Sequence, residues 1–205
     1  YARTLPNIDK QRIALWGTSF AGGLVVTVAA QDGKVAATVS QCPMLDGLAS
    51  ALEIARYAGV FSLLRVSTHG VFDVARSIVG ASAHYIPAAA KEGEVGAMTS
   101  ADAFDAYLRL APQNSTHQNQ VTARTGLLVP MFRPIRDAAK VKCPALLQIC
   151  TQDTVAPAAA AEKAAKKMPK AEVVRYPVGH FDVYFGDAFE HSVSDQLAFL
   201  QKHLL

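Results

Sequence analysis

The sequence predicts an α/β fold in which a parallel β-sheet is flanked by helices. Short runs of apolar and β-branched residues alternate with helical segments, as they do when a chain returns repeatedly to one sheet. Two of these runs, residues 35–40 and 145–150, are small or apolar at almost every position. Such runs are typical of parallel strands that are buried on both faces. A third observation is a serine in a turn of small residues, directly after the first predicted strand.

The composition suits one globular domain, or one domain that carries an insertion. The chain has 205 residues, of which 51% are hydrophobic, so it can bury a substantial core. Its net charge is +3, and no run of Lys and Arg with interleaved aromatic residues indicates nucleic-acid binding. No apolar stretch is long enough to cross a bilayer, and the chain does not open with a signal peptide. We therefore expect no membrane partner and a cytoplasmic location.

The cysteines and the glycine-rich turn give no sign of a cofactor. Cys42, Cys143 and Cys150 lie in or beside apolar segments, and their number is odd. Buried free thiols in a reducing compartment are therefore expected, in preference to a structural disulfide. No His, Cys or Asp spacing resembles a zinc site, and residues 17–23 lack the Lys of a P-loop and a dinucleotide fingerprint. We expect neither a metal nor another cofactor.

The turn between the first predicted strand and the first predicted helix contains the candidate nucleophile. Residues 13–16 favour a strand, the next seven residues (GTSFAGG) form a turn, and residues 24–30 continue as an apolar helix. Gly17 and Ala21 flank Ser19, and only small side chains fit there because strand and helix approach closely. This is the layout of a nucleophile elbow, which raises a serine hydroxyl above the sheet. The alternative is a small-residue turn before an ordinary packed helix.

The middle of the chain has a different pattern. After the strand at residues 35–40, helical periodicity occurs at residues 48–57, 71–79 and 101–110, with loops between them, among them residues 113–120. No strand alternation is sustained there. We interpret residues 47–136 as a helical insertion.

The sheet resumes after the insertion. Strands are predicted at residues 145–150 and 171–176, and helices at residues 156–167 and 189–204. The order strand, helix, strand, insertion, strand, helix, strand, helix favours a parallel sheet. The predicted core comprises residues 1–46 and 137–205.

Three polar residues follow strands of this sheet: Ser19 the first, Asp153 the third and His180 the fourth. Because the carboxyl ends of parallel strands share one edge, these side chains should meet. A serine needs a histidine to take its proton, and that histidine needs a carboxylate to hold its tautomer. We therefore predict Ser19 as nucleophile, Asp153 as acid and His180 as base. Asp46, which follows the second strand, is the alternative acid.

Three segments, residues 12–23, 150–157 and 179–184, resemble the catalytic blocks of bacterial α/β-hydrolases, in particular the dienelactone-hydrolase-like and acyl-esterase-like branch. The resemblance implies a partial α/β-hydrolase fold with a helical cap. It also implies a serine hydrolase that acts on a small-molecule ester or lactone through an acyl-enzyme. The backbone N–H of Phe20 would then be one oxyanion donor.

The resemblance covers the sheet from the elbow strand onward. Such hydrolases usually have further strands before it, with a His-Gly-type loop that gives a second oxyanion N–H, and these are absent here. The chain thus resembles the C-terminal two-thirds of such a hydrolase, and we expect either that it is a C-terminal piece of a longer protein or that it works beside another chain. Without the further strands, the strand at residues 13–16 is an exposed edge, which favours self-association or pairing with a chain that supplies them. The alternative function is a catalytically inactive α/β-hydrolase-like fragment or binding module.

Overall fold

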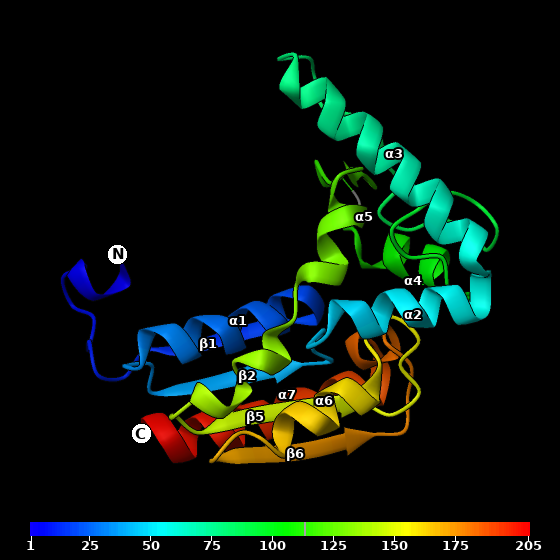
Figure 1. Ribbon diagram of the computed structural model, residues 1–205. Helices are drawn as coiled ribbons and strands as arrows, with labels where there is room; N and C mark the ends of the chain where they lie inside the picture. Colours follow the sequence, from blue (N-terminus) through cyan, green and yellow to red (C-terminus); the bar gives the residue numbers. More distant parts are fainter. Residues whose placement is uncertain (113) are drawn as a thin grey trace. The chain divides into compact units, whose positions relative to one another are not determined.

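The computed structural model describes residues 1–112 and 114–205, so the predicted loop at residues 113–120 begins outside the described residues. The chain divides into two compact units (Figure 1). We call Tyr1–Asp46 with Arg133–Leu205 the sheet unit, and Gly47–Phe132 the insertion unit. The second boundary lies four residues earlier than predicted. The reason is that Ile135 donates its N–H to the Leu45 carbonyl at 2.8 Å and Arg133 pairs with Asp46, so residues 133–136 belong to the sheet unit.

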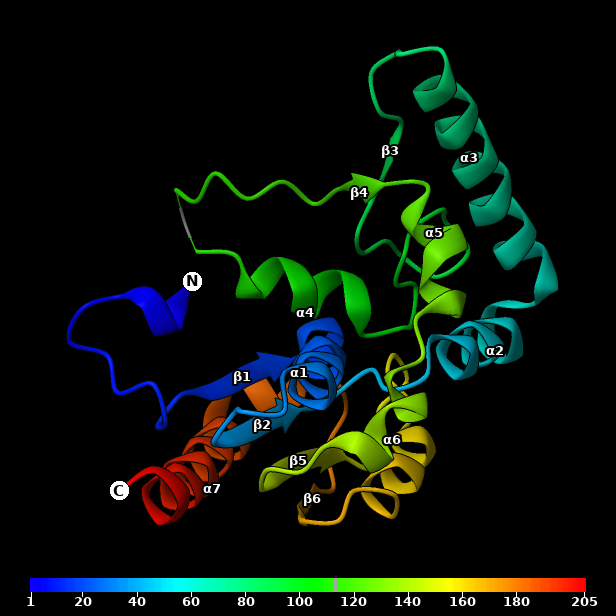
Figure 2. The same ribbon diagram turned by 60° about the vertical axis from the view of Figure 1, so that its left-hand side comes forward.

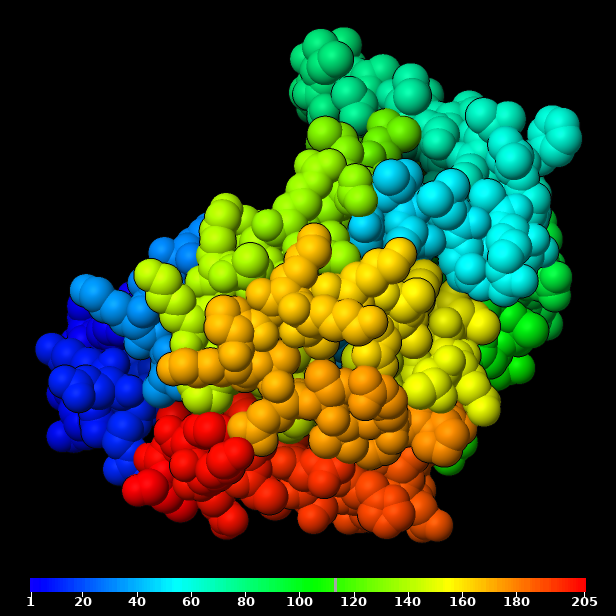
Figure 3. All heavy atoms as spheres, turned by 60° about the horizontal axis from the view of Figure 1, so that its bottom comes forward, coloured from blue at the N-terminus to red at the C-terminus, as the bar shows by residue number. Residues whose placement is uncertain are grey.

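The sheet unit contains a four-stranded, fully parallel sheet, as predicted. Its strands, in spatial order, are β1 (Ala14–Thr18), β2 (Ala37–Gln41), β5 (Ala145–Cys150) and β6 (Ala171–Tyr176). The central strands β2 and β5 are buried at every position, which explains their nearly continuous apolar runs. The edge strands are more exposed. In the space-filling view the orange residues around β6 lie on the surface beside the red residues of α7 (Figure 3).

Helices cover both faces of this sheet (Figure 2). On one face, α1 (Ser19–Asp32) and α6 (Ala158–Ala165) pack against the inward side chains of β5. On the other face, Phe199 of α7 (Gly186–Leu204) packs against β2 and β5. Single 3-10 turns lie at Ala2–Thr4, Pro134–Arg136, Ala138–Lys140 and Asp182–Tyr184.

A buried hydrogen-bond network joins the sheet to α7. Gln148 Nε2 donates to the hydroxyl of Tyr176 at 2.7 Å and to the carbonyl of Ser192 at 2.8 Å. Gln196 Nε2 donates to Gln148 Oε1 at 2.7 Å. Because an unpaired buried amide costs about 1–3 kcal/mol, this network favours one seating of α7 on the sheet. The loop that carries His180 leads directly into that helix.

The insertion unit is mainly helical, as expected, but it also contains a small sheet. Its elements are α2 (Gly47–Ala58), α3 (Val60–Ile78), β3 (Tyr85–Ile86), α4 (Ala103–Leu110), β4 (Val121–Thr122), α5 (Thr125–Leu128) and a 3-10 turn at Val129–Met131. β3 and β4 pair antiparallel over two residues each, which is too short for alternation to reveal them. The role of this unit as a cap over Ser19 stays a prediction.

A buried ion pair stabilises the insertion unit. The Asp73 side chain on α3 is fully buried and accepts hydrogen bonds from Nε and Nη2 of Arg124 at 2.6 and 3.0 Å. It also accepts the backbone N–H groups of His84 at 2.7 Å and Arg124 at 3.0 Å. The hydrogen-bonded Arg124 guanidinium holds the pKa of Asp73 well below its usual range. The carboxylate therefore ties α3 to two later segments.

We expect Asp73→Asn to lower the Tm by several degrees, because a neutral amide leaves the Arg124 charge uncompensated. Since the folded-state pKa is depressed, the contribution of Asp73 is complete above its unfolded pKa of about 4 and is lost as pH falls toward the folded value. Thermal unfolding followed by circular dichroism at pH 7 and pH 3 measures both effects. Asp105→Asn, at an exposed position on α4, is the matched control. An equal Tm for both variants would contradict the assignment.

Candidate active site

The turn between β1 and α1 has the geometry of a nucleophile elbow. Ser19 is the first residue of α1 and has φ 53°, in the left-handed region. A Cβ added at Gly17 would lie 2.3 Å from the carbonyl oxygen of Ala21, so only glycine fits there. Ala21 itself lies within the helix and has no positive φ. Position 21 therefore does not need the conformational freedom of glycine, and alanine fits where the α/β-hydrolases that this chain resembles usually have glycine.

The structure brings Ser19, His180 and Asp153 into one hydrogen-bonded row. Nε2 of His180 lies 3.0 Å from Ser19 Oγ, and Nδ1 lies 2.6 Å from Asp153 Oδ2. The side chains of His180 and Asp153 are only 2% and 1% exposed. All three belong to the sheet unit and follow β1, β6 and β5, respectively. In this arrangement a carboxylate holds one ring nitrogen and leaves the other facing a hydroxyl.

Backbone N–H groups fix the orientation of the Asp153 carboxylate. Oδ1 accepts the N–H groups of Val155 at 2.8 Å and Ala156 at 2.6 Å, so Oδ2 is the oxygen that faces His180. Asp182 has a different task, because its Oδ2 accepts the N–H of Gly179 at 2.9 Å and shapes the histidine loop. Asp182 lies only two residues after His180 in the sequence. Its carboxylate accordingly accepts a hydrogen bond from the backbone of the same loop and does not orient the histidine ring.

Asp46, the alternative acid, is engaged elsewhere. Its two carboxylate oxygens accept hydrogen bonds from Nε and Nη2 of Arg133, each at 2.8 Å. This bidentate pair joins the segment after β2 to the segment that re-enters the sheet unit. Phe20, the predicted oxyanion donor, is the second residue of α1, at the positive end of the helix dipole.

One cluster beside the row was not predicted from the sequence. The hydroxyl of Tyr184 lies 2.6 Å from Thr18 Oγ1 and 3.1 Å from Cys42 Sγ. It thus connects the end of β1, the end of β2 and the histidine loop. Burial raises the pKa of Tyr184, so the hydroxyl stays protonated. No local pattern could pair Tyr184 with Thr18, because 166 positions separate them.

The remaining chemistry of the described chain is limited. All three cysteines are free, and Cys42 and Cys150 are buried. Within residues 1–112 and 114–205, no group of three or more His, Cys, Asp or Glu side chains is arranged to hold a metal ion. In the same residues, no helix combines the length and apolar character needed to cross a membrane.

Comparisons with known proteins give a partial match to one family model and longer alignments with individual relatives. A family model described as acetyl xylan esterase (AXE1) matches residues 1–74, which include β1, the elbow and β2. The chain is 38% identical over 202 residues to the quorum-quenching protein AidA of Acinetobacter baumannii, an alignment that covers 98% of the chain and 65% of that relative. The chain thus spans less than two thirds of the length of this relative. It is 24% identical over 204 residues to the polyketide transferase grgF of Penicillium sp., covering 97% of the chain and 65% of the relative.

Solved structures share the fold at lower sequence identity. The α/β hydrolase GrgF from Penicillium sp. superposes with a TM-score of 0.70 at 21% identity, covering 98% of this chain and 67% of that one. DcsB, solved in complex with its substrate analogue, gives a TM-score of 0.75 at 21% identity, covering 98% and 68%. At such identities the likeness concerns the fold alone.

Proposed function

We propose that this chain, which has an α/β-hydrolase fold, is a member of that superfamily in its acyl-esterase-like branch and a serine hydrolase of carboxylic esters. The observation that carries the proposal is the hydrogen-bonded row from Ser19 through His180 to Asp153, with distances of 3.0 and 2.6 Å. Lactones belong to the same substrate class because they are cyclic esters. One relative is a quorum-quenching protein. For this reason, bacterial signalling molecules that contain an ester or lactone bond are candidate substrates.

In the proposed acylation, Ser19 Oγ attacks the carbonyl carbon of the ester while His180 Nε2 takes the hydroxyl proton. Asp153 keeps the other ring proton on Nδ1 and stabilises the imidazolium. The negative charge on the carbonyl oxygen is stabilised by the backbone N–H of Phe20. When the tetrahedral intermediate collapses, the bond to the alcohol oxygen breaks and His180 donates its proton to that oxygen.

Deacylation repeats these steps with water. His180 Nε2 takes a proton from the water as its oxygen attacks the acyl carbon, and returns it to Ser19 Oγ when the acyl bond breaks. The balance is one ester and one water consumed, and one carboxylic acid and one alcohol formed. Asp46 takes no part, since its carboxylate pairs with Arg133.

The open edge of the sheet favours a second candidate, a binding module. Among the described strands β1 pairs only with β2, and Trp16 on β1 is 53% exposed. On α1, Leu24 and Val28 are 42% and 45% exposed. An unpaired strand edge beside apolar side chains is suited to accept a further strand, from this protein or from another chain.

A fluorophosphonate probe separates the two candidates. We expect covalent labelling of Ser19, competition by p-nitrophenyl acetate, and hydrolysis of short p-nitrophenyl esters. Both the chain and the longest form that its gene encodes are tested, because in serine hydrolases the loss of one oxyanion donor lowers the rate about a hundred- to a thousandfold. No labelling and no hydrolysis by either form would contradict the hydrolase proposal and favour the binding module.

Tyr184→Phe should lower kcat about tenfold with little change in KM, because the hydroxyl links the end of β1 to the histidine loop. Tyr176→Phe is the matched control. It removes a buried hydroxyl that bonds to Gln148 at 2.7 Å and Asp195 at 2.6 Å, in the network under α7. Steady-state kinetics and Tm are measured for both variants. We expect a similar loss of Tm but less than a twofold change in kcat for the control; equal losses of kcat would contradict a positioning role.

A further inference from the structure

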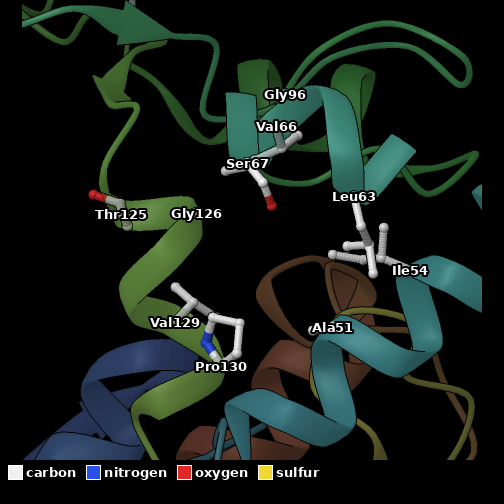
Figure 4. Close-up of a pocket in the computed structure, with 11 residues that line it drawn as sticks. Ala51, Ile54, Leu63, Val66, Ser67, Gly96, Thr125, Gly126, Val129 and Pro130 are labelled. Carbon is white, nitrogen blue, oxygen red and sulfur yellow. The ribbon is translucent and has the colours of Figure 1, made fainter. Parts of the chain in front are cut away.

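A small apolar cavity lies wholly within the insertion unit, and the proposed reaction does not use it (Figure 4). Its volume is about 140 Å³. Its walls are formed by α2, α3, α5 with the turn that follows it, and the loop at residues 96–97. Its lining residues are Ala51, Ile54, Leu63, Val66, Ser67, Gly96, Ala97, Thr125, Gly126, Val129 and Pro130.

The lining contains no charged side chain and one inward-facing hydroxyl. Leu63 and Ile54 lie on one side and Val129 on another, while the Ser67 oxygen points into the space between them (Figure 4). The Thr125 oxygen points away from it. In the part of the chain that the structure describes, no hydrogen bond of the Ser67 hydroxyl is found. An apolar space with one available hydroxyl matches the usual make-up of a ligand site.

The two helices that form opposite walls cannot move closer to fill this space. A Cβ added at Gly126 of α5 would lie 2.5 Å from Val66 Cγ1 of α3. A Cβ added at Gly70 of α3 would lie 2.7 Å from Leu127 Cγ of α5. α3 and α5 are therefore already in contact through glycines, and this contact keeps the neighbouring space open.

We propose that this cavity binds an unbranched alkyl group of about six carbons that carries a hydroxyl or carbonyl at one end. The size follows from the volume, since apolar cavities of about 150 Å³ accommodate benzene. The absence of charge in the lining excludes an ionised group, whose burial without a partner is costly. The Ser67 hydroxyl then bonds to the polar end. Binding at this site requires no turnover, so it is tested separately from the proposed hydrolysis.

Binding of n-alkanols from propanol to decanol, followed by NMR chemical-shift titration, tests the size of the occupant. We expect affinity to rise about fourfold for each methylene up to about hexanol and then to level off, because further carbons find no apolar wall. Saturable shifts should be confined to the cavity lining. Affinity that keeps rising to decanol, or shifts spread over the surface, would indicate partition onto exposed apolar residues and overturn the proposal.

Substitutions in the lining test its location, with neighbours as controls. Leu63→Phe fills the cavity and should abolish hexanol binding, whereas Leu64→Phe, at a 55% exposed position on the same helix, should not. Ser67→Ala should weaken hexanol by roughly two- to tenfold and leave benzene unchanged. Equal effects of Leu63→Phe and Leu64→Phe would overturn the assignment.

A variant in the opposite direction covers the case in which Leu63→Phe does not fold. Val129→Ala enlarges the cavity and should shift the levelling of affinity to a longer alkanol. Leu128→Ala, whose native side chain is 56% exposed, is its control and should leave the chain-length profile unchanged. An unshifted profile in folded Val129→Ala would overturn the proposal.

Discussion

Ser19→Ala should remove nearly all ester hydrolysis, with a loss in kcat of about a millionfold. The hydroxyl oxygen is the atom that forms the acyl bond in the proposed mechanism, and alanine offers no replacement. Ser19 already has φ 53°, which alanine must also adopt, so the fold of each variant is checked by circular dichroism and Tm. Fluorophosphonate labelling should disappear together with turnover.

His180→Ala should lower kcat by about the same factor. The double variant should lose no more kcat than either single variant, because the members of a catalytic triad act as a unit and their effects are not additive. His191→Ala is the matched control, since this histidine is exposed on α7. Its kcat should stay within a factor of two of the wild type. Retention of more than about a tenth of kcat in folded Ser19→Ala or His180→Ala would contradict the proposed roles.

The sheet could be predicted from sequence because its signal is local. The bounds of β5 and β6 agree with the predicted segments, since buried strands are short apolar or β-branched runs with clear ends. The elbow turn was predictable for a related reason, namely that close backbone approach restricts several neighbouring positions to small residues at once. α1 nevertheless begins at Ser19, five residues before the predicted apolar helix, because the small residues of the turn form its first coils.

The insertion was harder to predict because its helices depend on tertiary contacts. α3 begins at Val60, eleven residues before the predicted segment at residues 71–79. Its first eleven residues, 60–70, include Ser67, Thr68 and Gly70, which have low helix propensity and weaken the local pattern. The structure explains why a glycine occurs within this helix, because the close contact of Gly70 with Leu127 of α5 requires glycine. Packing between helices therefore outweighs propensity in this segment.

Asp153 is the acid that the sequence predicts and Asp46 is its alternative, and the structure adds the partners of each. Asp46 and Asp153 both follow strands of the parallel sheet, so order along the chain leaves them equivalent. Their partners differ: Asp46 pairs with Arg133 across 87 positions, and Asp153 lies 2.6 Å from His180 across 27 positions. Neither pairing has a local sequence pattern. This difference in partners leads to opposite expectations for the two asparagine substitutions.

Asp153→Asn should lower kcat about ten-thousandfold while the fold is kept. The oxygen of the amide can still accept the N–H groups of Val155 and Ala156, which bond to Oδ1 at 2.8 and 2.6 Å. Its NH2 group then faces His180 Nδ1 and donates to it. The ring proton moves to Nε2, the nitrogen that lies 3.0 Å from Ser19 Oγ, and this nitrogen can no longer take the serine proton.

Asp46→Asn is the matched comparison, because it makes the same chemical change at the other carboxylate that follows a strand. It breaks the bidentate pair with Arg133, so it should lower the Tm while kcat falls less than about tenfold. Steady-state kinetics with p-nitrophenyl acetate and thermal unfolding are measured on both variants. The two readouts should therefore separate, with kcat lost at Asp153 and stability lost at Asp46. The reverse ranking in kcat would transfer the role of the acid to Asp46, and equal small losses would mean that His180 needs no carboxylate for the reaction.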